Sequence, residues 1–107
     1  MEVQEIERQI ARRIIDDALA AGFAIDVYDG GDFAIEKSTD ADAIFSAMFS
    51  TDDDRLYMHK DGKQVGSVWL IYGESGWDVI TDYSMSIDDL LQGALKLSEE
   101  LEGKLNG

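Results

Sequence analysis

The chain has 107 residues and a formal net charge of −14, with 23 acidic residues against nine basic ones. A hydrophobic fraction of 45% is ordinary for a folded domain, so we expect a single domain over residues 1–107 and not a disordered acidic chain. The chain contains no cysteine, which excludes disulfides, a thiolate nucleophile and a cysteine-based zinc site. The charge argues against direct binding of nucleic acid or of an anionic membrane, and it favours a cationic partner.

The amino-terminal segment, residues 1–13, is charged and lacks the apolar region of a signal peptide. The sequence also contains no apolar run long enough to cross a bilayer. We therefore expect a cytoplasmic protein with no membrane partner.

The first predicted elements are a helix and a hairpin. Apolar residues recur at helical spacing over residues 3–21, and Gly22 is a residue type that often follows a helix. The apolar side of this helix consists of Ile6, Ile10, Ile14, Ala18 and Ala21. Alternation of apolar and polar residues predicts a strand over 23–28, and a partner strand is expected over 33–36 after a turn at 29–32.

Two aspartate-rich segments raise the question of a metal site. The turn Asp29-Gly30-Gly31-Asp32 lacks the alternating acids and the distal glutamate of an EF-hand loop, and two carboxylates alone make a weak calcium or magnesium site. The segment Asp52-Asp53-Asp54 lacks neutral ligands and a defined spacing. We interpret both segments as loops, and we predict no metal and no cofactor.

A second helix of about ten residues is predicted to start at Thr39 as N-cap, with Asp42 three residues later. Its apolar side is supplied by Ala41, Ile44, Phe45, Met48 and Phe49. It is expected to end before the loop at 50–54.

Residues 55–83 are predicted to form three strands in a meander. Asp61-Gly62 is a strong hairpin-turn signal, and Gly73 to Gly76 marks the second reversal. The segment Val65 to Tyr72 is apolar and rich in β-branched residues, so we expect it to be the central strand. Residues 77–83 form the last predicted strand.

The last predicted helix opens with Ser86 and Asp89 as a capping box. Its apolar stripe consists of Ile87, Leu90, Leu91, Ala94, Leu95, Ser98 and Leu101. The order α-β-β-α-β-β-β-α predicts an α+β fold in which three helices lie largely on one face of a mostly antiparallel five-stranded sheet.

No catalytic motif is visible in the sequence. His59 is the single histidine, and without a recognisable orienting partner we interpret it as a half-exposed strand residue. Paired carboxylates, such as Asp78 with Asp82 or Asp26 with Glu36, leave a small hydrolase as the weakest alternative. We predict that the protein is not an enzyme.

The charge instead suggests a surface that takes the place of nucleic-acid phosphates. Duplex DNA carries one charge per about 1.7 Å, so a net charge of this size matches roughly 24 Å of duplex. Asp78 and Asp82 on one strand, with Asp26 on another, would form such a row. The candidate partner-binding carboxylates are Asp26, Asp29, Asp32, Asp52, Asp53, Asp54, Glu74, Asp78 and Asp82. Tyr28 and Tyr57 are candidate aromatic anchors, and Trp77 is either a third anchor or a core residue.

Two other interpretations remain open. The acidity can serve only solubility, in which case the chain is an acidic protein-interaction module without nucleic-acid mimicry. An apolar patch around Trp69 or Tyr72 can instead make a homodimer.

The segments IDVYDGGDFAIEKSTD and VGSVWLIYGESGWDVITDYS, within residues 22–84, resemble small acidic proteins of phages, prophages and other mobile elements. In size and acidity the chain also resembles phage-encoded inhibitors of host defence nucleases, the anti-CRISPR and antirestriction proteins, several of which are DNA mimics. These resemblances imply a non-enzymatic inhibitor or decoy. Its partner would be a basic nucleic-acid-handling protein of the host cytoplasm, either a CRISPR effector or a restriction nuclease.

Overall fold

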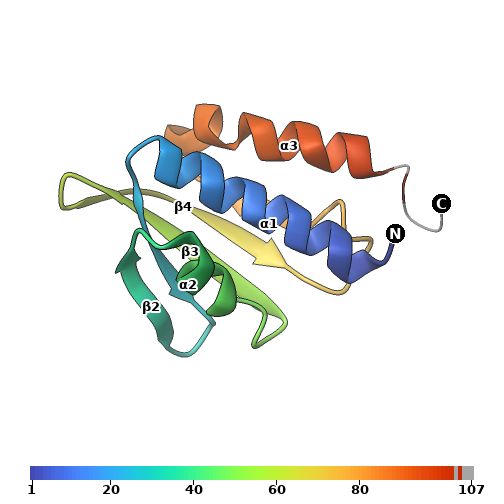
Figure 1. Ribbon diagram of the computed structural model, residues 1–107, viewed down its shortest axis with the longest axis horizontal. Helices are drawn as coiled ribbons and strands as arrows, with labels where there is room; N and C mark the ends of the chain where they lie inside the picture. Colours follow the sequence, from blue (N-terminus) through green and yellow to red (C-terminus); the bar gives the residue numbers. More distant parts are fainter. Residues whose placement is uncertain (103, 105–107) are drawn as a thin grey trace.

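The computed structural model describes residues 1–102 and 104, and it confirms the α+β fold (Figure 1). The elements are α1 (Val3–Ala20), β1 (Ala24–Tyr28), β2 (Phe33–Ser38), α2 (Ala41–Ser46), β3 (Asp53–Lys60), β4 (Lys63–Ile71), β5 (Ile80–Tyr83) and α3 (Asp88–Glu102). A short 3-10 helix, Met85–Ile87, leads into α3. Among the described residues, no helix combines the length and the apolar character that crossing a membrane requires.

The five strands form one antiparallel sheet in the order β2-β1-β3-β4-β5. Strand β4 lies between β3 and β5, so the prediction that residues 65–72 form the central strand of the meander is confirmed. The middle strand of the whole sheet is β3, because β1 pairs with the other edge of β3 and places Val27 opposite Leu56. Local sequence does not specify this long-range pairing, because each strand of a hairpin has a free edge that can pair with another strand.

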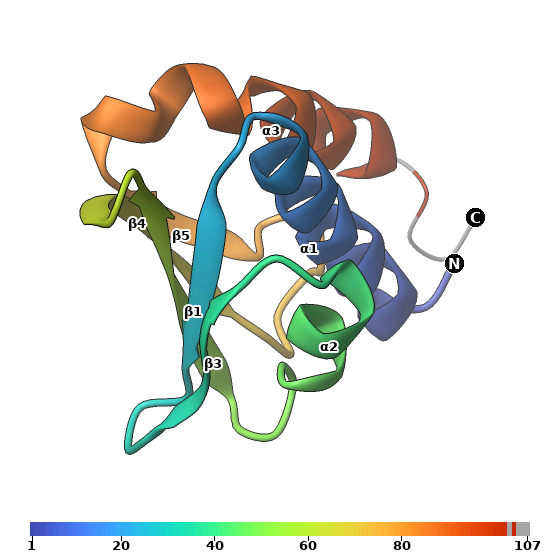
Figure 2. The same cartoon turned by 60° about the vertical axis from the view of Figure 1, so that its left-hand side comes forward.

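All three helices lie on one side of the sheet, and the other side is left open (Figure 2). The core between the layers is fully apolar at its centre and includes Ile6, Ile10, Ile14, Ile25, Leu56, Met58, Val68, Leu70 and Leu91. Gly66 allows the 3-10 helix to pack closely on β4, because a Cβ atom there would lie 2.7 Å from Cγ2 of Ile87. The period-two pattern of the strands then places every second side chain on the open side.

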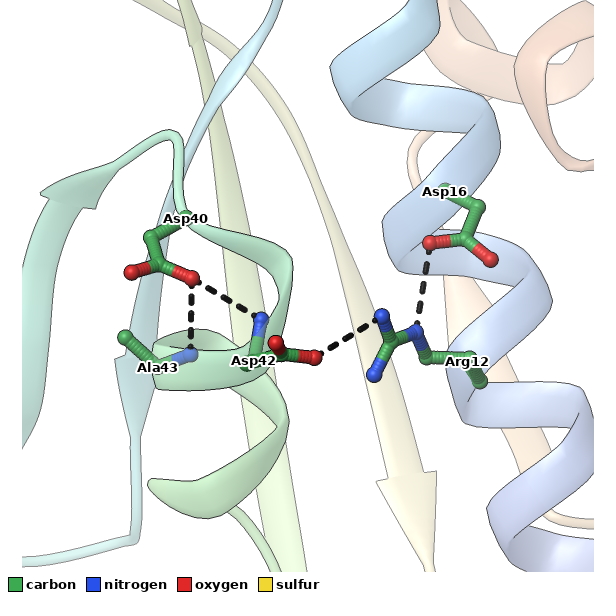
Figure 3. A network of polar contacts seen from close by, with 5 residues as sticks. All are labelled: Arg12, Asp16, Asp40, Asp42 and Ala43. Atoms are coloured by element: carbon green, nitrogen blue, oxygen red, sulfur yellow. Dashed lines mark hydrogen bonds and ion pairs between the residues drawn. The ribbon is translucent and has the colours of Figure 1, made fainter.

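The structure corrects the predicted starts of α2 and α3. The N-cap of α2 is Asp40 and not Thr39, since one carboxylate oxygen of Asp40 accepts the backbone N–H groups of Asp42 and Ala43 at 3.0 and 3.2 Å (Figure 3). The helix has six residues instead of about ten. Ser86 does not cap α3, because its hydroxyl donates to the carbonyl oxygen of Val65 at 2.6 Å.

Two strand boundaries also differ from the prediction, and both affect the candidate acids. Strand β3 begins at Asp53, so Asp53 and Asp54 belong to a strand and not to a loop. Strand β5 begins only at Ile80, which leaves Trp77 and Asp78 in the preceding turn. Asp78 and Asp82 therefore do not form a row along one strand.

Candidate protein-binding surface

Three acidic loops meet at one end of the sheet. The hydroxyl of Thr51 donates to the backbone carbonyl of Asp29 at 3.0 Å, which ties the β1–β2 turn to the segment before β3. The backbone carbonyl of Asp52 accepts the N–H of Tyr72 at 2.9 Å, which ties that segment to the β4–β5 loop. We call this region the acidic end, and its carboxylates are Asp29, Asp32, Asp52, Asp53, Glu74 and Asp78.

The carboxylates of the acidic end differ in how tightly they are held. Asp32, Asp52 and Glu74 are exposed. Asp29 accepts the backbone N–H groups of Asp32 and Gly31, and these hydrogen bonds lower the pKa of Asp29 below its ordinary value. None of the six carboxylates forms an ion pair with any residue that the structure describes. The acidic end therefore carries uncompensated negative charge.

Acids elsewhere on the surface are partly neutralised. Arg12 bridges α1 and α2, with ion pairs to Asp16 at 3.2 Å and to Asp42 at 3.1 Å (Figure 3). Arg13 pairs with Asp17 at 2.8 Å. These pairs lie on the helical layer, so the arginines reduce the charge there and leave the acidic end unchanged.

Two of the predicted binding acids are buried. The relative exposure of Asp26 is 6%, and that of Asp54 is 0%. Neither carboxylate can act as a phosphate-like surface charge, so the prediction does not hold for these two residues. The triple aspartate was expected to be a loop, but strand alternation turns Asp54 toward the helices and the preceding residue, Asp53, toward the open side.

Asp26 and His59 form an unexpected pair on the open side of the sheet. The distance between Oδ2 of Asp26 and Nε2 of His59 is 2.7 Å, and Oδ1 of Asp26 accepts the N–H of Lys37 at 2.6 Å. The His59 side chain is only 12% exposed, so the expected half-exposed histidine without a partner was wrong. Sequence reasoning missed the pair because it depends on the β1–β3 register, in which Ala24 lies opposite His59.

The Asp26–His59 contact is expected to couple β1, β2 and β3. In a double-mutant cycle of Asp26→Ala and His59→Ala, we expect a coupling free energy of about 1 kcal/mol, since each single variant leaves a sheltered polar group without its partner. Urea unfolding of the four proteins measures it. Asp82→Ala, which removes an exposed carboxylate from the same side of the sheet, is the control and should show no coupling to His59→Ala.

A second group of buried polar side chains lies under the helices beside the acidic end. Oδ2 of Asp54 accepts the hydroxyl of Tyr72 at 2.5 Å and the N–H of Phe49 at 3.0 Å. Oδ1 has no hydrogen-bond partner among residues 1–102 and 104. Glu7 is 3% exposed and accepts the N–H of Gly73 at 2.6 Å. Burial raises the pKa of both carboxyl groups above the ordinary values, and burial together with Asp54 raises the pKa of Tyr72.

The open side of the sheet carries an aromatic cluster. The ring centroids of Tyr28 and Tyr57 lie 6.4 Å apart, and Phe33 lies 5.0 Å from the first ring and 6.0 Å from the second. The two predicted tyrosine anchors are thus brought together. Phe33, which was not predicted as an anchor, is 48% exposed. Trp77 is absent from this cluster because it packs against the core.

The aromatic surface continues along β3 and β4. The guanidinium carbon of Arg55 lies 4.6 Å from the ring centroid of Trp69, whose indole N–H donates to Asp53 at 2.9 Å. Asp82 lies opposite Trp69 on β5. Trp69 is on the open face, whereas the hydroxyl of Tyr72 reaches a buried carboxylate, so one apolar patch cannot include both residues. We call the surface formed by Tyr28, Phe33, Arg55, Tyr57, Trp69 and Asp82 the open face.

Within the described residues, no group of three or more histidine, aspartate or glutamate side chains is arranged to hold a metal ion.

The acidic end and the open face lie next to each other, since Asp53 of the acidic end accepts a hydrogen bond from Trp69 of the open face. Comparison with family models, with curated proteins and with solved structures gave no match, so the chemistry of these residues carries the functional inference.

Proposed function

We propose that this chain is a non-enzymatic inhibitor or decoy that binds a basic, nucleic-acid-handling protein through the acidic end and the open face. The observation that supports this proposal is the meeting of three acidic loops, separate in sequence, beside an aromatic surface. A basic groove that holds nucleic-acid phosphates is the complementary surface. The resemblance to mobile-element proteins makes a host defence nuclease the first class of partner to test.

The two parts of the surface would make different contributions to binding. Exposed charges such as Asp32, Asp52 and Glu74 accelerate association and select a cationic partner, but each contributes little free energy in salt. Large rings and arginine are the residue types that most often dominate binding free energy. Tyr28, Tyr57 and Trp69 would therefore hold the complex after the acidic end has oriented it.

The test is capture of partner proteins from a host lysate at low and high salt. The variant Asp32→Asn/Asp52→Asn/Glu74→Gln removes one charge from each acidic loop, and all three side chains are exposed. We expect the variant to retain about a tenth of the low-salt binding, since three surface charges at up to about 1 kcal/mol each can change affinity by this factor. High salt should weaken the wild type in the same way.

The matched control is Asp61→Asn/Asp89→Asn/Glu100→Gln, which changes the net charge equally at exposed positions outside the three loops. The proposal requires this control to bind like the wild type. An equal loss of binding in both triple variants would mean that the overall negative charge, and not the acidic end, determines binding. A doubled molecular mass by light scattering, unchanged by salt, would instead show that the chain is a homodimer.

A further inference from the structure

A cavity opens at the acidic end, between the first turns of α1 and the loops that flank β3 and β4. Its volume is about 270 Å³, and its walls include Glu7, Arg8, Phe49, Asp52, Tyr72 and Gly73. The cavity is separate from the open face, because its walls come from the helical side of the sheet. A partner that covers the acidic end would lie over its mouth.

The carboxylate of Glu7 is the polar group that distinguishes this cavity. Its side chain is almost fully buried, and one oxygen accepts the N–H of Gly73 at 2.6 Å. The other oxygen has no hydrogen bond to any residue that the structure describes. Glu7 also forms no ion pair within that part of the chain. Arg8 lies near Glu7 but makes no ion pair with it. A buried carboxylate without an ion-pair partner is costly, so the cavity wall contains an acceptor that a cationic group in contact with it would stabilise.

Asp54 adds a second buried carboxylate behind the cavity. Tyr72, a wall residue, donates its hydroxyl to Oδ2 of Asp54, while Oδ1 is buried without a partner in the described part of the chain. The negative groups in and behind the walls are thus Glu7, Asp52 and Asp54, and the positive group is Arg8. Since the Arg8 side chain is exposed, solvent screens its charge more than it screens those of the buried acids.

Aromatic rings form the rest of the wall. The ring centroids of Phe49 and Tyr72 lie 4.7 Å apart, and the guanidinium carbon of Arg8 lies 4.6 Å from the Phe49 centroid. The Phe49 ring therefore already accepts one cation on its face. Ring faces beside a carboxylate are the surroundings in which proteins bind alkylammonium groups.

We propose that this cavity binds a primary alkylammonium group, supplied by a lysine side chain of the partner. The inference rests on the proposed function for the identity of the partner, but not for the chemistry of the cavity. Glu7 offers one free oxygen, which suits a compact ammonium charge. A guanidinium group would require both carboxylate oxygens for its two parallel hydrogen bonds.

Binding of the ammonium group should also depend on pH. Burial raises the pKa of Glu7 and of Asp54, and a bound cation favours the ionised form of each. The charged or titratable groups facing Glu7 are Asp78, Arg8 and Tyr72. Those facing Asp54 are Tyr72, Asp29 and Asp53. Because binding then releases protons, affinity should increase as the pH rises above the ordinary carboxyl pKa of about 4.

The experiment is a titration of the isotope-labelled full chain with n-butylammonium chloride at constant ionic strength, followed by amide NMR shifts. We expect saturable shifts centred on Thr51, Tyr72 and Gly73. Glu7→Gln keeps an oxygen for the Gly73 N–H but removes the charge, and it should weaken binding about tenfold or more. Glu5→Gln makes the same chemical change at an exposed position of α1 and should stay within twofold of the wild type.

Several outcomes would overturn the proposal. These are the absence of saturable shifts, shifts spread evenly over the acidic loops, and binding that Glu7→Gln leaves unchanged while its Gly73 amide signal stays native. Stronger shifts of the same amides with calcium chloride would make the cavity a metal site instead. The titration needs no partner protein. A failure of n-butylammonium to bind would therefore rule out the lysine site without deciding the lysate experiment. A failure to capture a partner from lysate would likewise leave the cavity proposal undecided.

Discussion

Leu56→Ala is expected to lower the free energy of unfolding by about 2–5 kcal/mol, the largest effect of any single change proposed for this protein. Leu56 lies in the central strand β3 and is fully buried, and its neighbours across the sheet are Val27 on β1 and Val68 on β4. Truncation to alanine leaves a cavity, because the three neighbouring strands and the overlying helices cannot move together far enough to fill it. Thermal unfolding followed by circular dichroism should show a midpoint lower by roughly 10–20 °C.

The control for this prediction is Val65→Ala. Val65 lies on the adjacent strand β4 but is 37% exposed, so its truncation removes few core contacts. We expect a loss below about 1 kcal/mol, as for most surface substitutions. If the two variants lost similar stability, β3 would not be the centre of the core.

Local sequence patterns predicted most of the fold. The helical spacing of Ile6, Ile10 and Ile14 gave α1 to within a residue at its carboxyl end, and the Asp61-Gly62 signal gave the β3–β4 hairpin. Both features depend on residues close in sequence, whose backbone preferences and apolar periodicity are visible directly. The order of all eight main elements followed from such local signals.

The errors concern contacts between distant segments. The β1–β3 pairing, which no local signal indicated, brings Asp26 to His59 across 33 positions in sequence. Asp52, Asp53 and Asp54 were all predicted to lie in an exposed loop. Strand alternation instead turns Asp53 toward the open side and buries Asp54 under the helices. Polarity alone predicts exposure, and only the register shows which acids have backbone or hydroxyl donors that allow burial.

The candidate surface was predictable in part. Asp29, Asp32 and Asp52 were expected on loops, and the structure places their loops side by side. Phe33 was missed as an anchor because an apolar residue in a short strand normally indicates core. Its exposure arises from the position of β2 at the sheet edge, where no further strand covers it.

Asp54→Asn is expected to make the stability of the protein less dependent on pH. Burial raises the folded-state pKa of Asp54 above the unfolded value of about 3.9, so the folded state binds the proton more tightly. The resulting stabilisation is fully present below the unfolded pKa and is lost as the pH rises through the folded pKa. The contribution of Asp54 to the free energy of unfolding of the wild type should therefore fall as the pH rises above about 4.

Asparagine at this position cannot titrate, but its amide oxygen can still accept the Tyr72 hydroxyl and the Phe49 N–H. We expect the variant to exceed the wild type in stability at pH 8 by on the order of 1 kcal/mol and to lose that advantage toward pH 4. Urea unfolding at both pH values measures the difference, which separates Asp54 from the similar contribution of Glu7. Asp52→Asn, an exposed neighbour, should keep the wild-type slope, and a wild-type slope in Asp54→Asn would mean that Asp54 stays ionised in the folded protein throughout this range.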